Sequence, residues 1–382
     1  MEKKNDKPKK EQRRRFIKGA FGIGGIMLGS PMLSFMSAPA AGAGRKQKEK
    51  LGIALVGLGN YSTNQLAPAL QETKNCYLAG IVTGTPSKID DWTKKYDIPQ
   101  KNVYNYENFD EIANNDDIDI VYVVLPNAIH PEFVIRAAKA KKNVICEKPM
   151  ATNVEDAQKM LDACNENGVR LAIGYRLHFE PFNKRVMEFG QQQVFGKVKS
   201  ITANNSSDMT SNKPNIWRLD KELAGGGPLM DLGIYAVQGA VYTMGKPPVA
   251  VTAAYGEVTK PLYFHDVEQS IHWELEFEDG VKAQSNSSYA EEQNELSAEA
   301  ENGWWKLSPA YAYEGKKGET SEGKMDYPNI YEQVKQMDSQ AASFRKNEKS
   351  IVPGEMGVRD MKILMAIYES ADAGGKRVEI QY

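Results

Sequence analysis

Short apolar segments alternate with helix-forming segments between residues 51 and 176, and this alternation restricts the fold more than any other feature. The apolar segments are a few residues long and rich in Val and Ile, which is typical of strands buried on both faces. Strands separated by helices form a parallel, doubly wound sheet. We expect strands near 51–56, 77–82, 119–127, 144–146 and 170–176, and helices near 65–70, 132–140 and 153–167.

The first of these strands runs into a glycine-rich turn. Gly57-Leu58-Gly59 is followed by Asn60, Tyr61 and Ser62, so a serine stands where a dinucleotide-binding turn usually has its third glycine. The glycines allow backbone N–H groups to approach a pyrophosphate at the start of a helix. Because the turn follows an apolar strand and opens a strand–helix–strand unit, we expect the domain at 51–175 to bind a dinucleotide.

The second strand ends in a segment without carboxylates. An NAD-binding domain usually places Asp or Glu about 20 residues beyond the glycines, where it holds the ribose 2′-hydroxyl. Thr83, Gly84 and Lys88 stand in this segment instead, and hydroxyls with a lysine suit a 2′-phosphate. The segment favours NADP as the cofactor, with the alternative that Asp90 or Asp91 supplies the carboxylate from the next helix.

Glu147-Lys148-Pro149 directly follows the strand at 144–146. In an open parallel sheet, ligands bind beyond the carboxyl ends of the strands, so this pair is expected at the reaction site. Pro149 disfavours a helical conformation at Lys148, and a lysine fixed there can direct its ammonium at a hydroxyl or carbonyl of a substrate. The alternative is a solvated Glu–Lys pair in a loop.

After residue 176 the pattern changes to longer alternating strands without helices between them. We expect strands near 198–204, 249–258, 270–278, 281–289 and 304–307, and a hairpin turn at Asp279-Gly280. This part of the chain should form an antiparallel sheet. Helical periodicity returns at 330–345 and 357–373, and the Gly-, Lys- and Glu-rich stretch 314–323 is expected to be a mobile loop.

A second chemical cluster follows the glycines at 225–227. A helix that begins near Pro228 places Asp231 and Tyr235 four residues apart on one face. A carboxylate beside a phenol can orient or accept a proton while the phenol reaches a substrate, and the three glycines would allow a ligand close to the backbone. The alternative is an aspartate favoured by the helix dipole and a core tyrosine.

The first 40 residues have the order of an export signal. Arg13-Arg14-Arg15 precedes an apolar, glycine-containing stretch at 19–36 and then Ala38-Pro39-Ala40, which predicts a cleaved signal peptide of the twin-arginine type. The alternative is a basic disordered arm. The apolar stretch is too weakly hydrophobic for a membrane anchor, and residues 41–50 are expected to be an arm or linker.

Charge and residue counts exclude several classes of function. Residues 1–40 carry nine basic and three acidic side chains, so the remaining chain has a net charge of −8, against −2 for the whole. That balance argues against nucleic acid as a partner. Three cysteines without C-x-x-C spacing and four histidines without H-x-H or H-x-x-x-H spacing indicate neither a disulfide framework nor a metal site.

The motifs together resemble the glucose–fructose oxidoreductase / inositol dehydrogenase (Gfo/Idh/MocA) family, and within it the glucose–fructose oxidoreductase type. The matching motifs occur in the family's order and cover nearly all of 51–382: Gly57-Leu58-Gly59, Leu125-Pro126-Asn127, Glu147-Lys148-Pro149, Gly174-Tyr175-Arg176, Trp217-Arg218-Leu219 and Asp231-Leu232-Gly233-Ile234-Tyr235. Many members of the family carry histidine at the position of Tyr235, whereas the glucose–fructose type carries tyrosine.

The resemblance implies a role for each matching residue. Lys148 would contact the reacting hydroxyl and the cofactor, Tyr235 would be the general acid/base, and Asp231 would bind and orient the sugar. The pyrophosphate would lie on Gly57, Gly59, Asn60 and Tyr61, and the 2′-phosphate on Thr83, Gly84 and Lys88. Further residues would line the cofactor: Leu125, Asn127, His130, Glu147, Arg176, Trp217, Arg218 and Tyr313.

The resemblance also implies a fold class and a function. An α/β Rossmann domain at 51–175 would precede an α+β domain at 176–382, built on a large open antiparallel sheet that binds the substrate and forms homo-oligomers, dimers or tetramers. The C-terminal helices could pack back on the first domain. The protein would be an exported, periplasmic, NADP-dependent sugar oxidoreductase that holds its cofactor tightly, oxidises one sugar and reduces another.

Two other functions remain open at this stage. One is an NAD-dependent glycosidase that acts by transient oxidation of its sugar, although such enzymes typically lack the Glu147-Lys148-Pro149 motif. The other is an NADP(H)-binding protein without turnover, which should lack the lysine–tyrosine pair. Residues 259–269 and 311–329 differ from the composition expected of a glucose–fructose oxidoreductase, so the sequence does not identify the sugars.

Overall fold

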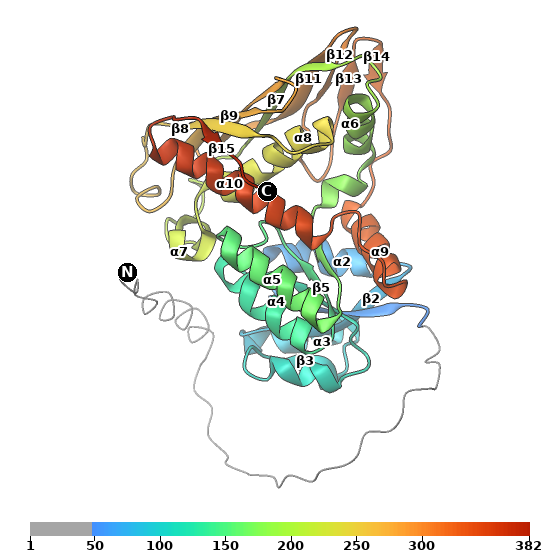
Figure 1. Ribbon diagram of the computed structural model, residues 1–382. Helices are drawn as coiled ribbons and strands as arrows, with labels where there is room; N and C mark the ends of the chain where they lie inside the picture. The colour runs from blue at the N-terminus through green and yellow to red at the C-terminus, as the bar shows by residue number, and fades with distance from the viewer. Residues whose placement is uncertain (1–47) are drawn as a thin grey trace.

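The computed structural model describes residues 48–382, so the predicted leader and most of the predicted arm lie outside the described residues. Two sheets, each packed against helices, form the two halves of the molecule, and the long helix α10 (Gly354–Asp372) runs between them (Figure 1). This helix contacts α5 (Val154–Asn167) of one half and strand β8 (Ala250–Tyr255) of the other. The halves therefore share part of their packing.

The first sheet has six parallel strands in the order β3-β2-β1-β4-β5-β6. They are β1 Leu51–Val56, β2 Cys76–Val82, β3 Val103–Tyr104, β4 Ile120–Val123, β5 Asn143–Cys146 and β6 Leu171–Ile173. The predicted doubly wound sheet is confirmed, with β3 as an additional short edge strand. The chain reverses its direction of winding between β1 and β4, which is where ligands bind in sheets of this kind.

Helices cover both faces of this sheet. Helices α4 (His130–Lys139) and α5 lie side by side on one face (Figure 1). The turn η1 (Ser62–Leu66), α2 (Ala67–Leu70) and α3 (Ile89–Tyr96) follow the first two strands, and α9 (Glu332–Arg345) from the far end of the chain joins the same core as β1. The Asn153 side chain caps α5 by accepting a hydrogen bond from the Asp156 backbone N–H.

The second sheet has nine strands in the order β14-β13-β12-β11-β7-β10-β9-β8-β15. They are β7 Val198–Ser206, β8, β9 Ser270–Glu276, β10 Lys282–Ser288, β11 Gln293–Ala300, β12 Trp304–Leu307, β13 Gly318–Thr320, β14 Gly323–Met325 and β15 Val378–Glu379. Neighbours are antiparallel except β7 and β10, which are parallel at the centre. Helix α8 (Ile234–Met244) comes between β7 and β8 in the chain and packs against the sheet. The chain crosses the sheet through this helix, which allows β10 to pair with β7 in the same direction.

Three expectations for this half were wrong. Helices α6 (Pro181–Gln191) and α7 (Lys221–Ala224) were not predicted. Strand β11 was not predicted because most of its residues are polar, which fits a strand that is only partly buried. The stretch 314–323, expected to be a mobile loop, instead contributes to the hairpin β13–β14, which extends the sheet beside β12.

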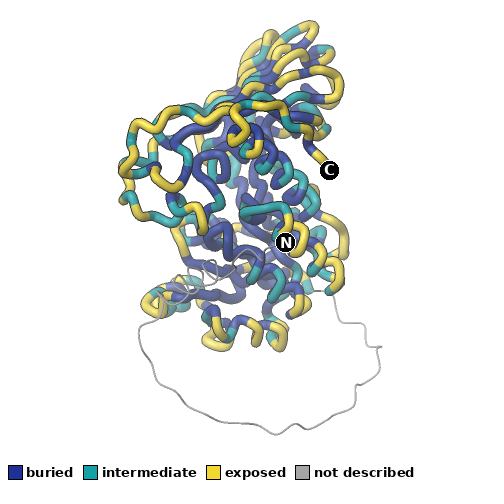
Figure 2. Tube along the Cα trace, turned by 60° about the vertical axis from the view of Figure 1, so that its left-hand side comes forward, coloured by how far each residue is buried: buried dark blue, intermediate teal, exposed yellow. Residues whose placement is uncertain are grey.

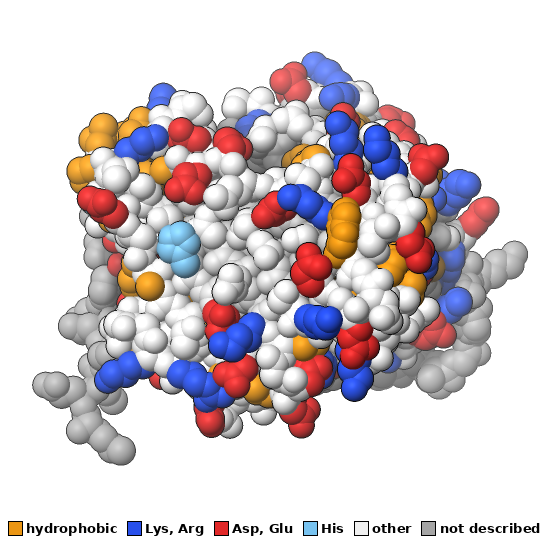
Figure 3. All heavy atoms as spheres, turned by 90° about the horizontal axis from the view of Figure 1, so that it is seen from above, with side chains coloured by type: hydrophobic (Ala, Val, Ile, Leu, Met, Phe, Trp, Pro, Cys, Tyr) orange, Lys and Arg blue, Asp and Glu red, His pale blue; other side chains and the backbone are white. Residues whose placement is uncertain are grey.

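Burial follows this layered arrangement. The deepest residues lie where α8 and α10 meet the nine-stranded sheet and inside the six-stranded sheet, while exposed residues gather at loops and strand ends (Figure 2). Seen from above, much of the outer surface consists of uncharged polar groups and backbone, and charged side chains of both signs are scattered over it and along its edges (Figure 3). Among residues 48–382, no helix is both long and apolar enough to cross a membrane.

Candidate active site

Lys148, Asp231 and Tyr235 come together at the carboxyl end of β5. Lys148 follows β5, Asp231 lies in the π-helical turn η8 (Leu229–Gly233), and Tyr235 lies in the first turn of α8. Lys148 Nζ donates to the Asp231 backbone oxygen at 2.7 Å and to its Oδ1 at 3.3 Å. The same ammonium lies 4.5 Å from the centroid of the Tyr235 ring. The structure thus places the three predicted catalytic residues in one cluster.

Asp231 is the electrostatic centre of this cluster. Its Oδ2 accepts hydrogen bonds from Arg218 Nε at 3.0 Å and from the Tyr289 hydroxyl at 3.2 Å. Burial alone would raise the pKa of Asp231, but the positive charges of Arg218 and Lys148 outweigh it and lower the pKa to about 2. Asp231 is therefore ionised at neutral pH and anchors two cations, which makes it unsuited to accept a proton.

Two cations face the Tyr235 ring. Besides Lys148, the Arg176 guanidinium lies 5.2 Å from the ring centroid, and Tyr311 lies beside it with centroids 6.2 Å apart. Within residues 48–382, the Tyr235 hydroxyl has no hydrogen-bond partner, so it is available to a substrate. Positive charge next to a phenol stabilises the negative charge that forms on its oxygen when the proton leaves.

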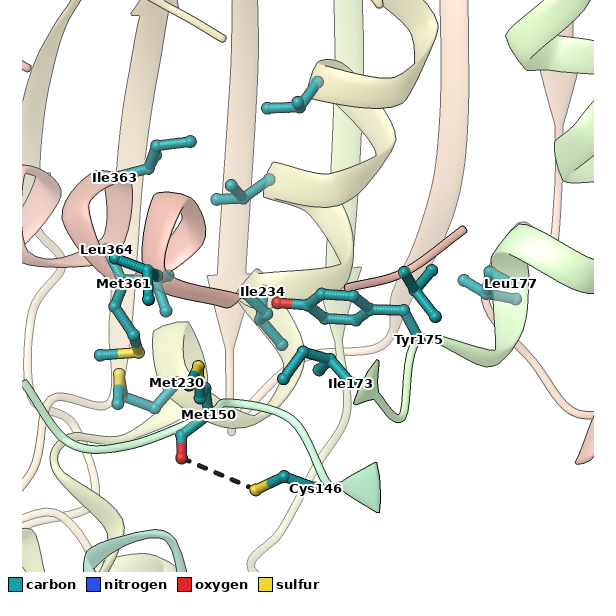
Figure 4. Packing of buried hydrophobic residues seen from close by; sticks show 14 of the residues in the cluster. Cys146, Met150, Ile173, Tyr175, Leu177, Met230, Ile234, Met361, Ile363 and Leu364 are labelled. Carbon is teal, nitrogen blue, oxygen red and sulfur yellow. Dashed lines mark hydrogen bonds between the residues drawn. The ribbon is translucent and has the colours of Figure 1, made fainter. Parts of the chain in front are cut away.

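A shared apolar core holds the two chemical segments against each other. Met150, just after the Glu-Lys-Pro motif, and Met230, just before Asp231, are fully buried. Figure 4 shows both methionines packed together with Met361 of α10, and the Cys146 thiol donates to the Met150 carbonyl at 3.8 Å. Because all of these groups are buried, Lys148 and Asp231 start from fixed backbone positions.

The three glycines at 225–227 serve packing, not the close approach of a ligand that we expected. A Cβ on Gly226 would lie 2.0 Å from the Tyr368 hydroxyl, and one on Gly227 would lie 2.5 Å from the Glu268 carbonyl. The Glu268 carboxylate accepts from the Gly227 and Leu229 backbone N–H groups at 2.9 and 3.2 Å and from Tyr368 at 2.7 Å. Glu268 thereby fixes the backbone that leads into Asp231. No motif or spacing in the sequence predicts this role of Glu268.

The glycine turn after β1 has the shape of a nucleotide cradle. Gly57 has φ of +95°, and a Cβ there would lie 2.3 Å from the Val124 carbonyl, whereas a Cβ on Gly59 would meet nothing within 4 Å. The Ser62 hydroxyl donates to the Gly57 carbonyl at 2.6 Å, which explains a serine in place of the third glycine. Open space at Gly59 fits a pyrophosphate close to the backbone.

The predicted 2′-phosphate segment lies beside this turn. Lys88 Nζ donates to the Leu58 carbonyl at 2.6 Å, so the lysine reaches from the end of β2 to the glycine turn. The Thr83 hydroxyl accepts from the Thr85 backbone N–H at 3.0 Å. Asp90 and Asp91 are exposed in the first turn of α3. The residues present fit an anionic 2′-phosphate better than a free ribose hydroxyl.

Several predicted cofactor-lining residues bond to protein groups. Both ring nitrogens of His130 contact backbone oxygens, of Leu125 at 2.7 Å and Pro149 at 3.1 Å, and burial lowers the pKa of His130 to about 4. Asn127 Nδ2 donates to the Ala224 carbonyl at 2.8 Å. The Glu147 carboxylate accepts from Tyr122 at 2.6 Å, and burial raises its pKa. These hydrogen bonds stabilise the loops around Lys148.

Four of the remaining predicted residues form ring and cation contacts with one another or with Arg176. Tyr61 stacks on Tyr313 with ring centroids 6.3 Å apart. The central carbon of the Arg176 guanidinium lies 4.3 Å from the centroid of the Tyr313 ring. Arg218 lies 4.5 Å above the Trp217 ring. These rings and cations come from both halves of the chain, and Tyr61 directly follows the glycine turn.

An unpredicted ion cluster holds Arg176. Its guanidinium pairs with Glu332 at the start of α9 and donates to the Tyr311 carbonyl, and Glu332 also pairs with Lys316. All three charged side chains are almost completely buried. In the part of the chain that the structure describes, no three His, Cys, Asp or Glu side chains are arranged to hold a metal ion, and the three cysteines are buried and unpaired.

The fold and the site define a class of protein. A glycine turn at the switch point of a doubly wound parallel sheet indicates a dinucleotide-binding Rossmann protein. A lysine and a tyrosine at the carboxyl ends of its strands add the groups needed for proton transfer during hydride transfer.

The family follows from comparison with known proteins. Residues 51–175 match the oxidoreductase family with an NAD-binding Rossmann fold, and residues 184–305 match the GFO/IDH/MocA C-terminal domain. The chain belongs to the Gfo/Idh/MocA family, which confirms the resemblance seen in the sequence.

Individual relatives cover most of the chain. The D-xylose 1-dehydrogenase [NADP(+)] of Haloarcula marismortui is 28% identical over 328 residues, 84% of this chain and 90% of that protein. The D-xylose 1-dehydrogenase (NADP(+)) 2 of Haloferax volcanii is 26% identical over 332 residues, 84% and 97% of the two chains. The solved aldose-aldose oxidoreductase from Caulobacter crescentus is 35% identical, with a TM-score of 0.83, over 87% of this chain and 100% of that one.

Proposed function

We propose that this chain is an NADP-dependent oxidoreductase that transfers hydride between the CH–OH carbon of a sugar and the cofactor. The observation that carries the proposal is the Lys148 ammonium, which bonds to Asp231 and lies over the Tyr235 ring. Lys88 at the glycine turn supports NADP as the cofactor. The two similar D-xylose dehydrogenases, which are both NADP(+) enzymes, support it as well.

The cofactor would lie on Gly57, Gly59, Asn60 and Tyr61, with its 2′-phosphate near Lys88. When bound, NADP supplies the acceptor and donor of hydride. The protein supplies the proton transfer, since Tyr235 as its phenolate can take the proton of a sugar hydroxyl and, as the phenol so formed, can return it in the reverse direction.

Lys148 has a second task besides stabilising the Tyr235 phenolate. An ammonium has three N–H donors, and two of those of Lys148 point to Asp231. The third is left for the reacting sugar oxygen. Asp231 therefore acts on the sugar through Lys148 and Arg218, whose positions it fixes.

The first experiment identifies the nucleotide. The purified protein is denatured, and the released small molecules are analysed by absorbance and mass; we expect NADP or NADPH. Release of NAD(H), or preferential rebinding of NAD, would contradict the assignment of residues 83–88. Reduction of the rebound cofactor by an aldose then separates an enzyme from a binding protein without turnover.

A finer proposal is that the enzyme exchanges hydride between two sugars and retains its cofactor. It is supported by the 35% identity to an aldose-aldose oxidoreductase, which this chain covers completely. With two aldoses and no added nucleotide, we expect continuous formation of an oxidised and a reduced sugar. A requirement for added NADP would make the protein an ordinary dehydrogenase, and cleavage of a glycoside would favour the glycosidase mechanism.

We also propose that the protein is exported and works as a homo-oligomer. Arg13-Arg14-Arg15 and the apolar stretch after it support twin-arginine export, which carries folded cargo. Folded export suits a periplasmic enzyme that must acquire its nucleotide in the cytoplasm. The open nine-stranded sheet supplies a broad face for self-association, and light scattering of the mature protein tests whether it is a dimer or a tetramer.

A further inference from the structure

A cavity of about 550 Å³ lies between α6, α9 and the turn η6 (Arg176–Phe179). Its volume is in the range of sites for small molecules. Lys148, Asp231 and Tyr235 do not line it, and the proposed hydride transfer makes no use of it.

The charge of the lining favours an anion. Lys184, Arg185 and Lys335 line the cavity together with one acidic residue, Glu188. Glu188 pairs with Arg185 at 2.6 Å. Within residues 48–382, neither Lys184 nor Lys335 has a carboxylate within 4.0 Å. Two ammonium groups, one from α6 and one from α9, therefore lie at the cavity without a carboxylate partner, and both residues are exposed.

The uncharged lining suits a molecule with both hydroxyl groups and C–H faces. Phe179 and Tyr327 supply aromatic rings, and Ser339 supplies a hydroxyl that can donate and accept. His178 also lines the cavity; burial lowers its pKa to about 4, so it is neutral at pH 7, and its Nε2 bonds to Gln238 Oε1 at 2.7 Å. Neutral polar groups of this kind pair with sugar hydroxyls.

We propose that this cavity binds a sugar acid, a carboxylate on a polyhydroxylated chain. The ligand class rests on the proposed function. Oxidation of an aldose at C1 transfers a hydride to NADP⁺ and a proton to the enzyme and gives a lactone, and addition of water opens the lactone to the acid. The cavity thus matches the hydrolysed product in charge and in polarity.

The cavity shares two elements with the active site. Turn η6 carries Arg176 at one end and Phe179 at the other, and α9 carries Glu332, the partner of Arg176, one turn before Lys335. A bound sugar acid therefore contacts the elements that fix the cation facing Tyr235.

Isothermal titration of the NADP-loaded protein with gluconate tests the proposal, with glucose and inorganic phosphate as comparison ligands. We expect gluconate to bind more tightly than either. The variant with Lys184→Glu and Lys335→Glu should bind gluconate at least 10-fold more weakly. Lys346→Glu, the same type of substitution at a single position at the end of helix α9 and outside the cavity, is the control and should bind like the wild type.

Three results would overturn the proposal: no gluconate binding, equal binding by the double variant, or equal binding of glucose or phosphate. Cofactor reduction by sugar is measured in the same variants and should keep its wild-type rate, because neither lysine belongs to the catalytic cluster. If gluconate binds at the cavity but no sugar reduces the cofactor, the proposed function fails separately from the site.

Discussion

Replacing Asp231 by Asn removes the charge that anchors Lys148 and Arg218, and its effect on stability can be calculated from the structure. The pKa of this carboxyl falls from 3.8 to about 2 because the two cations outweigh its burial. One pKa unit corresponds to about 1.4 kcal/mol. The ionised carboxylate therefore contributes roughly 2.4 kcal/mol to the free energy of unfolding at neutral pH.

The dependence on pH has a definite sign. A carboxyl with a lowered folded-state pKa stabilises the protein above its unfolded pKa, and this stabilisation is lost as the pH falls through the folded value. We expect Asp231→Asn to cost about 2 kcal/mol at pH 7 and roughly half as much at pH 3. Turnover should also fall, since Lys148 loses an ionised acceptor.

Chemical unfolding at pH 7 and pH 3, followed by tryptophan fluorescence, measures both values. Asp110→Asn is the control, because Asp110 pairs with Arg136 at 2.9 Å but its side chain is 69% exposed, and an exposed pair contributes less than about 1 kcal/mol. Equal stability of Asp231→Asn and wild type at pH 7, or a loss that is the same at both pH values, would refute the electrostatic role of Asp231.

Three further predictions follow from other parts of the chain. Lys88→Glu should shift the preference from NADP to NAD in binding titrations, and unchanged preference would mean that Lys88 only packs on the glycine turn. Replacing Arg13, Arg14 and Arg15 by Lys should retain the folded holoenzyme in the cytoplasm on cell fractionation, whereas normal export would point to another route. Glu268→Ala leaves two backbone N–H groups without their acceptor, which should lower the free energy of unfolding by about 1–3 kcal/mol. Thermal or chemical unfolding measures this loss, and a change within experimental error would show that the turn before Asp231 is stable without Glu268.

Short-range features of the site were predictable from the sequence. Gly57-Leu58-Gly59 and Glu147-Lys148-Pro149 each directly follow an apolar strand. Because the carboxyl ends of parallel strands lie at one edge of the sheet, both motifs can be assigned to that edge from the sequence. Asp231 and Tyr235 were found through their spacing in one helix. Both kinds of signal depend on residues that are close together in the chain.

Long-range partners could not be predicted in this way. Tyr289 reaches Asp231 from 58 residues away, and Glu332 reaches Arg176 from 156 residues away. A single tyrosine or glutamate has no spacing that identifies its partner. The parallel pairing of β7 with β10 was hidden for the same reason, since each strand alone has the alternation of an antiparallel sheet.

The role of the glycines at 225–227 shows a different limit. Their sequence is equally compatible with ligand approach and with tight packing, and only the positions of Tyr368 and Glu268 distinguish the two. Residue type restricts what a segment can do, but the neighbours that fold against it decide which possibility is realised.

Single-turnover reduction of the bound cofactor by an aldose, followed at the nicotinamide absorbance, tests the central claim most directly. Tyr235→Phe should bind NADP normally but reduce it roughly 10²–10⁴-fold more slowly, the usual contribution of a positioned acid/base. Lys148→Met should behave similarly, and the double variant should lose much less than the product of the two effects, because the residues act as a unit. Reduction of the cofactor by Tyr235→Phe at the wild-type rate would show that the phenol is structural and that the proposed proton transfer is wrong.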